Sequence, residues 1–151
     1  MKRSDFRVFL GNAPWRQKGR LGVRAGSRWP FSMPVSHGEK VPSYVPFPFF
    51  LGYATSVLEK AGFSALLMDA IAMGVDEDTF IQTAKDYSPH LVVLETSTPT
   101  FSVDMKIAKD FRNHLPNRQG SGSWVCSRQY QTVRMHLRRR RSRYPLYIQI
   151  S

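Results

Sequence analysis

The sequence predicts an α/β fold in which helices cover both faces of a parallel sheet. Three observations predict it. Short apolar runs at 6–10, 65–68 and 91–94 are typical of strands, apolar residues at helical spacing follow each run, and turn residues mark the joints. Strands that alternate with helices run parallel, because each crossover helix returns the chain to the same edge of the sheet.

The first strand is expected at 6–10, where Phe6-Arg7-Val8-Phe9-Leu10 is rich in strand-favouring residues. Gly11-Asn12 is a good turn pair and ends it. Residues 13–45 are then expected to form a long loop rich in Gly, Pro, Ser and Arg. Loops of this length in compact domains are usually functional or disordered.

The first helix is expected over 47–61, with Pro46 and Pro48 at its start and Gly62 at its end. We expect one face to be apolar, and its members are Phe49, Phe50, Tyr53, Val57, Leu58 and Ala61. The aromatic residues are interpreted as helix packing rather than a cofactor box, with Tyr44 and Phe47 best placed to reach a ligand ring.

The second strand is expected at 65–68, although its Leu and Met residues also suit a helix. Asp69 ends it, where a carboxylate could meet a ligand hydroxyl or cap the surface. The second helix begins at Asp76-Glu77-Asp78, whose charges suit the helix macrodipole, and ends at Ser88-Pro89. Its inner face is expected to be Phe80, Ile81, Ala84 and Tyr87.

The third strand is expected at 91–94, because Leu91-Val92-Val93-Leu94 suits a strand buried on both faces, and Thr96-Ser97-Thr98-Pro99 breaks it. A third helix follows, closed by Pro116, with Asp104 and Asp110 on its polar face. Its apolar positions are Val103, Ile107, Ala108, Phe111 and Leu115. Right-handed crossovers predict the strand order 3-2-1, with a fourth strand expected beyond the first.

That fourth strand is missing from the pattern after Pro116, because 117–123 contains no apolar residue. Only 144–150 looks strand-like there, and it could pair with the open edge of the first strand. The predicted fold is therefore a Rossmann-like parallel sheet with helices on both faces, incomplete after the third β-α unit. We divide the chain into an incomplete Rossmann-like domain, 1–116, and an Arg-rich tail, 117–151, expected to be irregular or non-native.

Charge separates the same two parts. The 151-residue chain has a net charge of +11, yet every acidic residue lies at or before Asp110, and 117–151 contains eight arginines and no lysine. The basicity is therefore mostly a property of the tail. The Arg-rich tail predicts an alternative function, in which a small basic protein binds nucleic acid through phosphate contacts and aromatic stacking. Its aromatic residues are Trp124, Tyr130, Tyr144 and Tyr147.

The single cysteine, Cys126, excludes an internal disulfide and a Cys-based metal cluster made by this chain alone. A cytoplasmic location fits this cysteine usage. The N-terminal apolar run is too short for a signal peptide or a membrane span, so we expect no membrane partner. No Ser/His/Asp set or pair of carboxylates has a catalytic spacing.

Several segments together resemble the N-terminal cobalamin-binding domain of radical-SAM enzymes over about residues 5–116. The resemblance lies in Tyr44 to Ala54 (YVPFPFFLGYA), Leu58 to Phe63 (LEKAGF), Met68-Asp69-Ala70 and Ser88 to Pro99 (SPHLVVLETSTP). Gly22 to Pro30 (GVRAGSRWP) is similar to a signature of one branch of that family.

The resemblance implies a corrinoid cofactor, cobalamin, held over the carboxyl ends of the strands. The loops after the first and third strands would make most contacts, and their matching residues are Gly11, Asn12, Ala13 and Pro14, then Glu95, Thr96, Ser97 and Thr98. Small hydroxyl residues at a strand end can hydrogen-bond the amide and phosphate groups of a large polar cofactor. The basic loop with Arg16, Lys18, Arg20, Arg24 and Arg28 could face such groups, an acidic partner domain or solvent.

Three motifs of the family are absent. The Asp-x-His-x-x-Gly motif does not follow the first strand, and the two histidines considered, His37 and His90, lie elsewhere, so we expect no protein histidine on cobalt. The Gly-Gly turn after a fourth strand is missing. The Cys-x-x-x-Cys-x-x-Cys motif is missing too, so we expect no iron–sulfur cluster in this chain and no enzymatic activity by itself.

The resemblance therefore implies a cofactor-binding module whose partner is a radical-SAM domain on a separate or longer chain. Family likeness, acidic residues and lysines all stop near Pro116. Our hypothesis is a truncated or frame-shifted product of a longer enzyme gene. Because the predicted sheet lacks its fourth strand, its first strand would be an exposed edge. We accordingly expect weak cobalamin binding or none.

Overall fold

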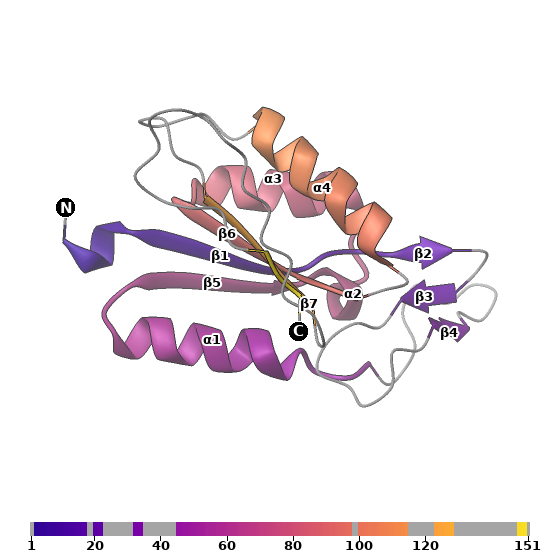
Figure 1. Ribbon diagram of the computed structural model, residues 1–151, viewed down its shortest axis with the longest axis horizontal. Coiled ribbons are helices and arrows are strands. Elements are labelled where there is room, and N and C mark those ends of the chain that lie inside the picture. The colour runs from indigo at the N-terminus through magenta and orange to yellow at the C-terminus, as the bar shows by residue number, and fades with distance from the viewer. Residues whose placement is uncertain are drawn as a thin grey trace.

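The computed structural model describes residues 2–17, 20–22, 32–34, 45–97, 100–114, 123–128 and 148–150. It shows an α/β arrangement in which a parallel sheet lies between one helix on one face and two on the other (Figure 1). The predicted fold class, a Rossmann-like parallel sheet with helices on both faces, is confirmed. A short 3-10 helix, Arg3–Asp5, precedes the first strand.

Five strands form the main sheet in the order β5-β1-β6-β7-β8, and every neighbouring pair is parallel. Their bounds are β1 Arg7–Asn12, β5 Ser64–Asp69, β6 Leu91–Thr96, β7 Ser123–Arg128 and β8 Ile148–Ile150. All three predicted strands are therefore confirmed, although β5 and β6 extend beyond the predicted ranges and β1 begins one residue later and includes the predicted turn pair Gly11-Asn12.

The predicted order 3-2-1 is wrong, because β1, not β5, lies at the centre of the first three strands. The chain leaves β1 toward β5 and then crosses back to place β6 on the opposite side of β1. Handedness restricts each crossover but does not fix the side toward which the chain moves. Numbered along the chain, the order is 2-1-3-4-5, one of the two common doubly wound arrangements.

The end of the chain also differs from expectation. Ser123–Arg128 forms a strand, β7, which pairs with β6 from Leu91↔Ser123 to Thr96↔Arg128. The segment expected to pair with the first strand instead contributes β8, which pairs with β7. Strand β1 therefore has neighbours on both sides and is not an exposed edge. Among the residues that the structure describes, none after α4 forms a helix.

Helices α3, Glu77–Tyr87, and α4, Phe101–His114, lie side by side on one face of the sheet (Figure 1). Beneath them Phe9, Phe80 and Phe111 are fully buried, and their ring centroids lie 5.5 to 6.1 Å apart. Aromatic pairs at such tilted geometries add about 0.5–1.5 kcal/mol each beyond burial of area. The predicted inner face of α3 is confirmed, with Tyr87 only partly buried.

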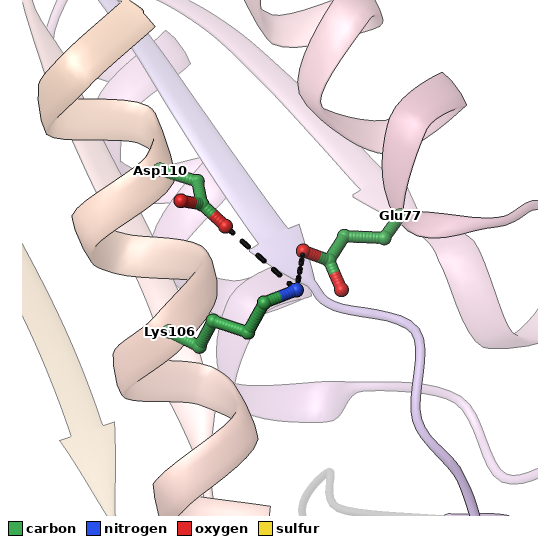
Figure 2. Close-up of polar contacts among 3 residues, drawn as sticks. All are labelled: Glu77, Lys106 and Asp110. Atoms are coloured by element: carbon green, nitrogen blue, oxygen red, sulfur yellow. Dashed lines mark hydrogen bonds and ion pairs between the residues drawn. The ribbon is translucent and has the colours of Figure 1, made fainter.

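An ion pair ties the outer surfaces of these two helices together (Figure 2). Lys106 Nζ of α4 lies 2.7 Å from Glu77 Oε1 of α3 and 3.9 Å from Asp110 Oδ2 one turn further along α4. The hydrogen bond and charge of Glu77 raise the pKa of Lys106 above its ordinary value. Because both ends are solvated, this ion pair contributes little to the stability of the fold.

Helix α1, Phe49–Lys60, covers the other face of the sheet alone (Figure 1). Its inner side contributes Leu51 to a core formed with Val8 and Leu10 of β1, and partly buried Ala54 and Leu58 pack around them. Gly62 adopts a left-handed conformation, φ 85°, just after the helix, as its predicted role requires.

The predicted apolar face of α1 is wrong in most of its members. Phe49, Phe50, Tyr53 and Val57 are exposed, as is Phe47 before the helix. The interpretation of these aromatic residues as core packing is therefore wrong as well. The helix is apolar on two sides, so periodicity could not decide which side faces the sheet.

The segment predicted to be one long loop contains a small antiparallel sheet in the order β2-β3-β4. Its strands are β2 Arg16–Gln17, β3 Arg20–Gly22 and β4 Ser32–Pro34. It follows directly from β1 and lies beyond the carboxyl ends of the parallel strands (Figure 1). The strands are too short to give a clear alternating pattern.

Candidate functional site

The carboxyl edge of the main sheet between β1 and β6 is the candidate site. The connection that follows β1 leads to β5 on one side, whereas the connection that follows β6 leads to β7 on the opposite side. In an open α/β sheet, such a reversal leaves a crevice at the carboxyl ends of the two adjacent strands, and ligands bind there. Both predicted site segments begin at this edge, since Gly11 and Asn12 end β1 and Glu95 and Thr96 end β6.

Gly11 lies within β1 rather than in a loop, and it is buried. A Cβ built on it would lie 2.5 Å from Cζ of Phe80 in α3 and 3.0 Å from Cδ2 of Leu94 in β6. Since Phe80 is fully buried, its ring has little room to move aside. The close packing of α3 on the sheet therefore explains this glycine without a ligand.

Asn12 is the last residue of β1 and is 2% exposed. Its Nδ2 donates a hydrogen bond of 2.9 Å to Oδ1 of Asp69, the residue opposite it at the end of β5. The same oxygen accepts from the backbone N–H groups of Ile71 and Ala72, each at 3.1 Å, and so caps α2, Ala70–Met73. Of the two predicted roles for Asp69, capping is thus the one seen.

The next two predicted site residues differ in burial. Ala13 is fully buried in the core beneath α3 and α4, whereas Pro14 is half-buried. Trp15 follows, with 7% of its surface exposed, and leads into β2. The turn after β1 is therefore packed on its inner side by small and aromatic residues.

Glu95 and Thr96 end β6 on opposite faces of the sheet, because side chains alternate along a strand. Glu95 shares its face with Leu91 and Val93, which pack toward α1. It is 5% exposed, and its Oε2 oxygen is buried. A carboxylate so deeply placed at a strand end is unusual, because burial of charge is costly unless it is balanced.

Thr96 belongs to a buried hydroxyl–carboxylate network on the α4 side. Asp104 Oδ2 accepts hydrogen bonds from Thr96 Oγ1 at 2.5 Å and from Thr100 Oγ1 at 2.6 Å. Ser97 joins through its hydroxyl, 2.9 Å from Thr100 Oγ1, and through its backbone N–H at 3.2 Å. Asp104 and Thr100 are fully buried. Two predicted ligand-binding hydroxyls therefore hold the turn from β6 to α4 in place.

The prediction that Asp104 lies on the polar face of the third helix is wrong, because Asp104 is fully buried. Its place in the sequence carried the signal, since Ile107 and Phe111 follow it by three and seven residues and share the buried face. The role of Thr100 was also not foreseen. Thr98 lies outside the described residues, so the structure does not place the fourth predicted member of this segment.

Of the two histidines considered as metal ligands, His90 is among the residues that the structure describes. His90 lies at the amino end of β6, where its ring stacks on Phe6 with centroids 5.0 Å apart and its Nδ1 accepts from the Arg7 N–H at 3.0 Å. That is the edge opposite the candidate site. His37 lies outside the described residues. Among the residues that the structure does describe, no group of three or more His, Cys, Asp or Glu could hold a metal ion.

The Arg-rich tail and most of the basic loop give no side-chain geometry, because their side chains lie outside the described part of the chain. Arg16 is described, and it is exposed. Nucleic-acid binding by the tail thus stays a prediction. No helix among the described residues is both long and apolar enough to cross a membrane.

The comparisons with known proteins add no relative. No family model matches this chain, and neither a curated protein nor a solved structure matches it.

Proposed function

We propose that this chain binds cobalamin at the carboxyl edge of the sheet, between the ends of β1 and β6. The observation that carries the proposal is the reversal of strand order between β1 and β6, which makes the ends of these two strands neighbours. Parallel neighbours end at the same edge, so Asn12 and Glu95 lie at the edge where a ligand would bind.

The residues present fit a large amide-bearing ligand in part. Buried carboxylate and amide groups at a strand end suit the recognition of polar ligand groups, and Asn12 and Glu95 supply them. In this proposal Thr96 and Ser97 position the site rather than contact the ligand. Their hydroxyls belong to the hydrogen-bond network around Asp104 that holds the turn from β6 to α4. The β2–β3–β4 sheet beyond this edge would border the ligand on its far side (Figure 1).

Bound cobalamin would supply a cobalt centre for methyl transfer or a related radical reaction. The residues of this chain hold and orient such a group, and the proposal assigns them no catalytic step. In this proposal the partner that completes an enzyme is a radical-SAM domain on a separate or longer chain. A single cysteine agrees with a reducing compartment such as the cytoplasm.

Titration of the purified full-length chain with hydroxocobalamin, read by visible absorbance and by equilibrium dialysis, tests the proposal. We expect weak, saturable binding at one equivalent. Replacing Glu95→Gln keeps the size of the side chain but removes its charge, and it should weaken binding at least threefold. The same change at exposed Glu59 of α1, E59Q, is the matched control and should leave binding unchanged. A folded chain that retains no cobalamin would refute the proposal.

A further inference from the structure

The outer side of α1 and the residue pair before it carry a continuous exposed apolar surface, here called the α1 stripe. Its members retain between 52% and 69% of their accessible surface, and they are Phe47, Phe49, Phe50, Tyr53 and Val57. Phe50, Tyr53 and Val57 are spaced by three and four residues and so share one face of the helix.

The area of this surface is comparable to that of the largest apolar patches on monomeric proteins. Aromatic side chains bury about 150–250 Å² each, so the stripe exposes roughly 500 Å² of apolar area. The largest apolar patch on a typical monomer is about 300–600 Å² and is often functional. If two copies joined through it, they would bury roughly 1,000 Å² in total, the lower limit for a specific interface.

We propose that the α1 stripe is a two-fold interface between two copies of this chain, formed by antiparallel packing of α1 on α1. No charged residue lies between Phe47 and Val57, because the only charged residues of the helix, Glu59 and Lys60, lie at its carboxyl end, so pairing through the stripe buries no charge within it. A two-fold axis between Tyr53 and Ala54 would bring Phe50 against Val57 of the partner subunit, a large side chain against a small one. The two helix dipoles would also oppose each other favourably.

One end of the stripe is already ordered in the single chain. The Phe47 ring lies over Gly52, where a Cβ would approach Phe47 Cε1 to 2.7 Å, and it meets Phe49 edge to face at 5.5 Å. Side chains that are fixed before association lose little entropy when they become buried. The stripe therefore presents a preformed aromatic surface to its partner.

The net charge of the chain predicts how salt affects the association of two copies. Each copy carries a net charge of +11, so two copies repel each other and added salt should tighten their association. Binding to nucleic acid or to another acidic partner would weaken with salt instead.

Sedimentation velocity of the full-length chain over a range of concentrations tests the interface, at low and at high salt. We expect a monomer–dimer equilibrium that shifts toward dimer in high salt. Tyr53→Glu should raise the dissociation constant at least tenfold. Ser102→Glu places the same charge on an exposed position of α4 and should leave it unchanged.

Disulfide crosslinking tests the proposed antiparallel register of the two α1 helices. Tyr53→Cys, close to the proposed axis, should crosslink to its copy under mild oxidation, whereas Ser102→Cys should not. A chain that stays monomeric at every concentration overturns the proposal, and so does a dimer that Tyr53→Glu leaves intact. Sedimentation of the monomer with phosphatidylcholine–phosphatidylglycerol vesicles, lost in Tyr53→Glu, would assign the stripe to a lipid surface instead and equally overturn it.

Discussion

Asp104 shows how one buried residue can decide the geometry of a candidate site. Its Oδ2 oxygen accepts from two hydroxyls, one at the end of β6 and one at the start of α4. Hydrogen bonds to a carboxylate are stronger than neutral ones, and a buried hydroxyl that loses its acceptor carries its full desolvation penalty. The position of the turn that follows β6 therefore depends on this carboxylate.

Asp104→Ala should lower the free energy of unfolding by about 2–4 kcal/mol, because it removes the acceptor that the hydroxyls of Thr96 and Thr100 share. Asp104→Asn keeps an acceptor oxygen and should lose less. Urea denaturation followed by circular dichroism measures both. Asp86→Ala, an exposed aspartate on α3, is the control and should change stability by less than about 0.5 kcal/mol. Equal losses for alanine at 86 and at 104 would contradict the network's role.

Gly11 gives a second prediction at the residue scale. Gly11→Ala places a methyl group within 2.5 Å of Phe80 Cζ in a packed core, so it should destabilise the fold by about 1–3 kcal/mol. Phe80→Leu opens the same space. In a double-mutant cycle, the pair should therefore cost less than the sum of the single changes. Strict additivity in denaturant melts would show that the glycine is required for some reason other than this contact.

At the scale of elements, α3 begins with a cap that titrates. Asp76 Oδ1 accepts from the Thr79 backbone N–H at 2.9 Å. Hydrogen bonds from the Thr79 side chain and backbone lower the pKa of Asp76 below its ordinary value of 3.8. The ionised cap therefore stabilises the fold above about pH 3.8, and that contribution disappears as the pH falls through the lowered folded-state pKa.

Asp76→Asn tests this dependence, since asparagine is an equally good cap but does not titrate. Thermal melts of both proteins between pH 2 and pH 6 should show the largest advantage of the natural chain at the upper end. The two curves should converge as the pH falls below about 3.8. A constant difference across this range would show that the charge of Asp76 plays no part in capping.

The elements that the sequence pattern predicted best are those whose apolar residues lie on one side only. Phe80, Ile81 and Ala84 of α3 are buried as periodicity indicated. Periodicity did not identify the buried face of α1, because Phe50 and Leu51 are neighbours in the sequence, yet Phe50 is exposed and Leu51 is buried. Strand β7 was missed because its apolar run, Trp124-Val125-Cys126, is only three residues long, and its pairing with β6 supplies the order.

The sequence predicted only part of the arrangement of the candidate site. Parallel strands end at one edge, so Asn12 and Glu95 were expected at that edge, but the predicted order 3-2-1 did not make their strands neighbours. Which hydroxyls face solvent and which face a helix depends on packing between β6 and α4 that no local pattern encodes. For that reason Thr96 was assigned to a ligand, whereas its hydroxyl binds Asp104.

For the whole molecule, the central question is where the folded unit ends. Composition placed a boundary at 116, yet β7 pairs with β6 at six successive positions and β8 pairs with β7. A strand buried in a sheet that loses its neighbour exposes a row of backbone groups and becomes a template for aggregation. Because β7 pairs with β6, we expect residues beyond the boundary to stabilise the candidate site by covering that edge of β6.

Two truncated chains test whether β7 stabilises the fold. The chain ending at residue 116 lacks β7 and β8, and we expect it to melt at least 5 °C below the full chain and to form oligomers of increasing size during storage. The chain ending at residue 128 keeps β7 and should lie close to the full chain in both properties, measured by differential scanning fluorimetry and light scattering. A 1–116 chain that matches the full chain would place the boundary where the charge pattern does. In that case the conformation of β6 near Glu95 would depend on the pairing of β6 with β1 and on the hydrogen bond from Thr96 to Asp104 of α4.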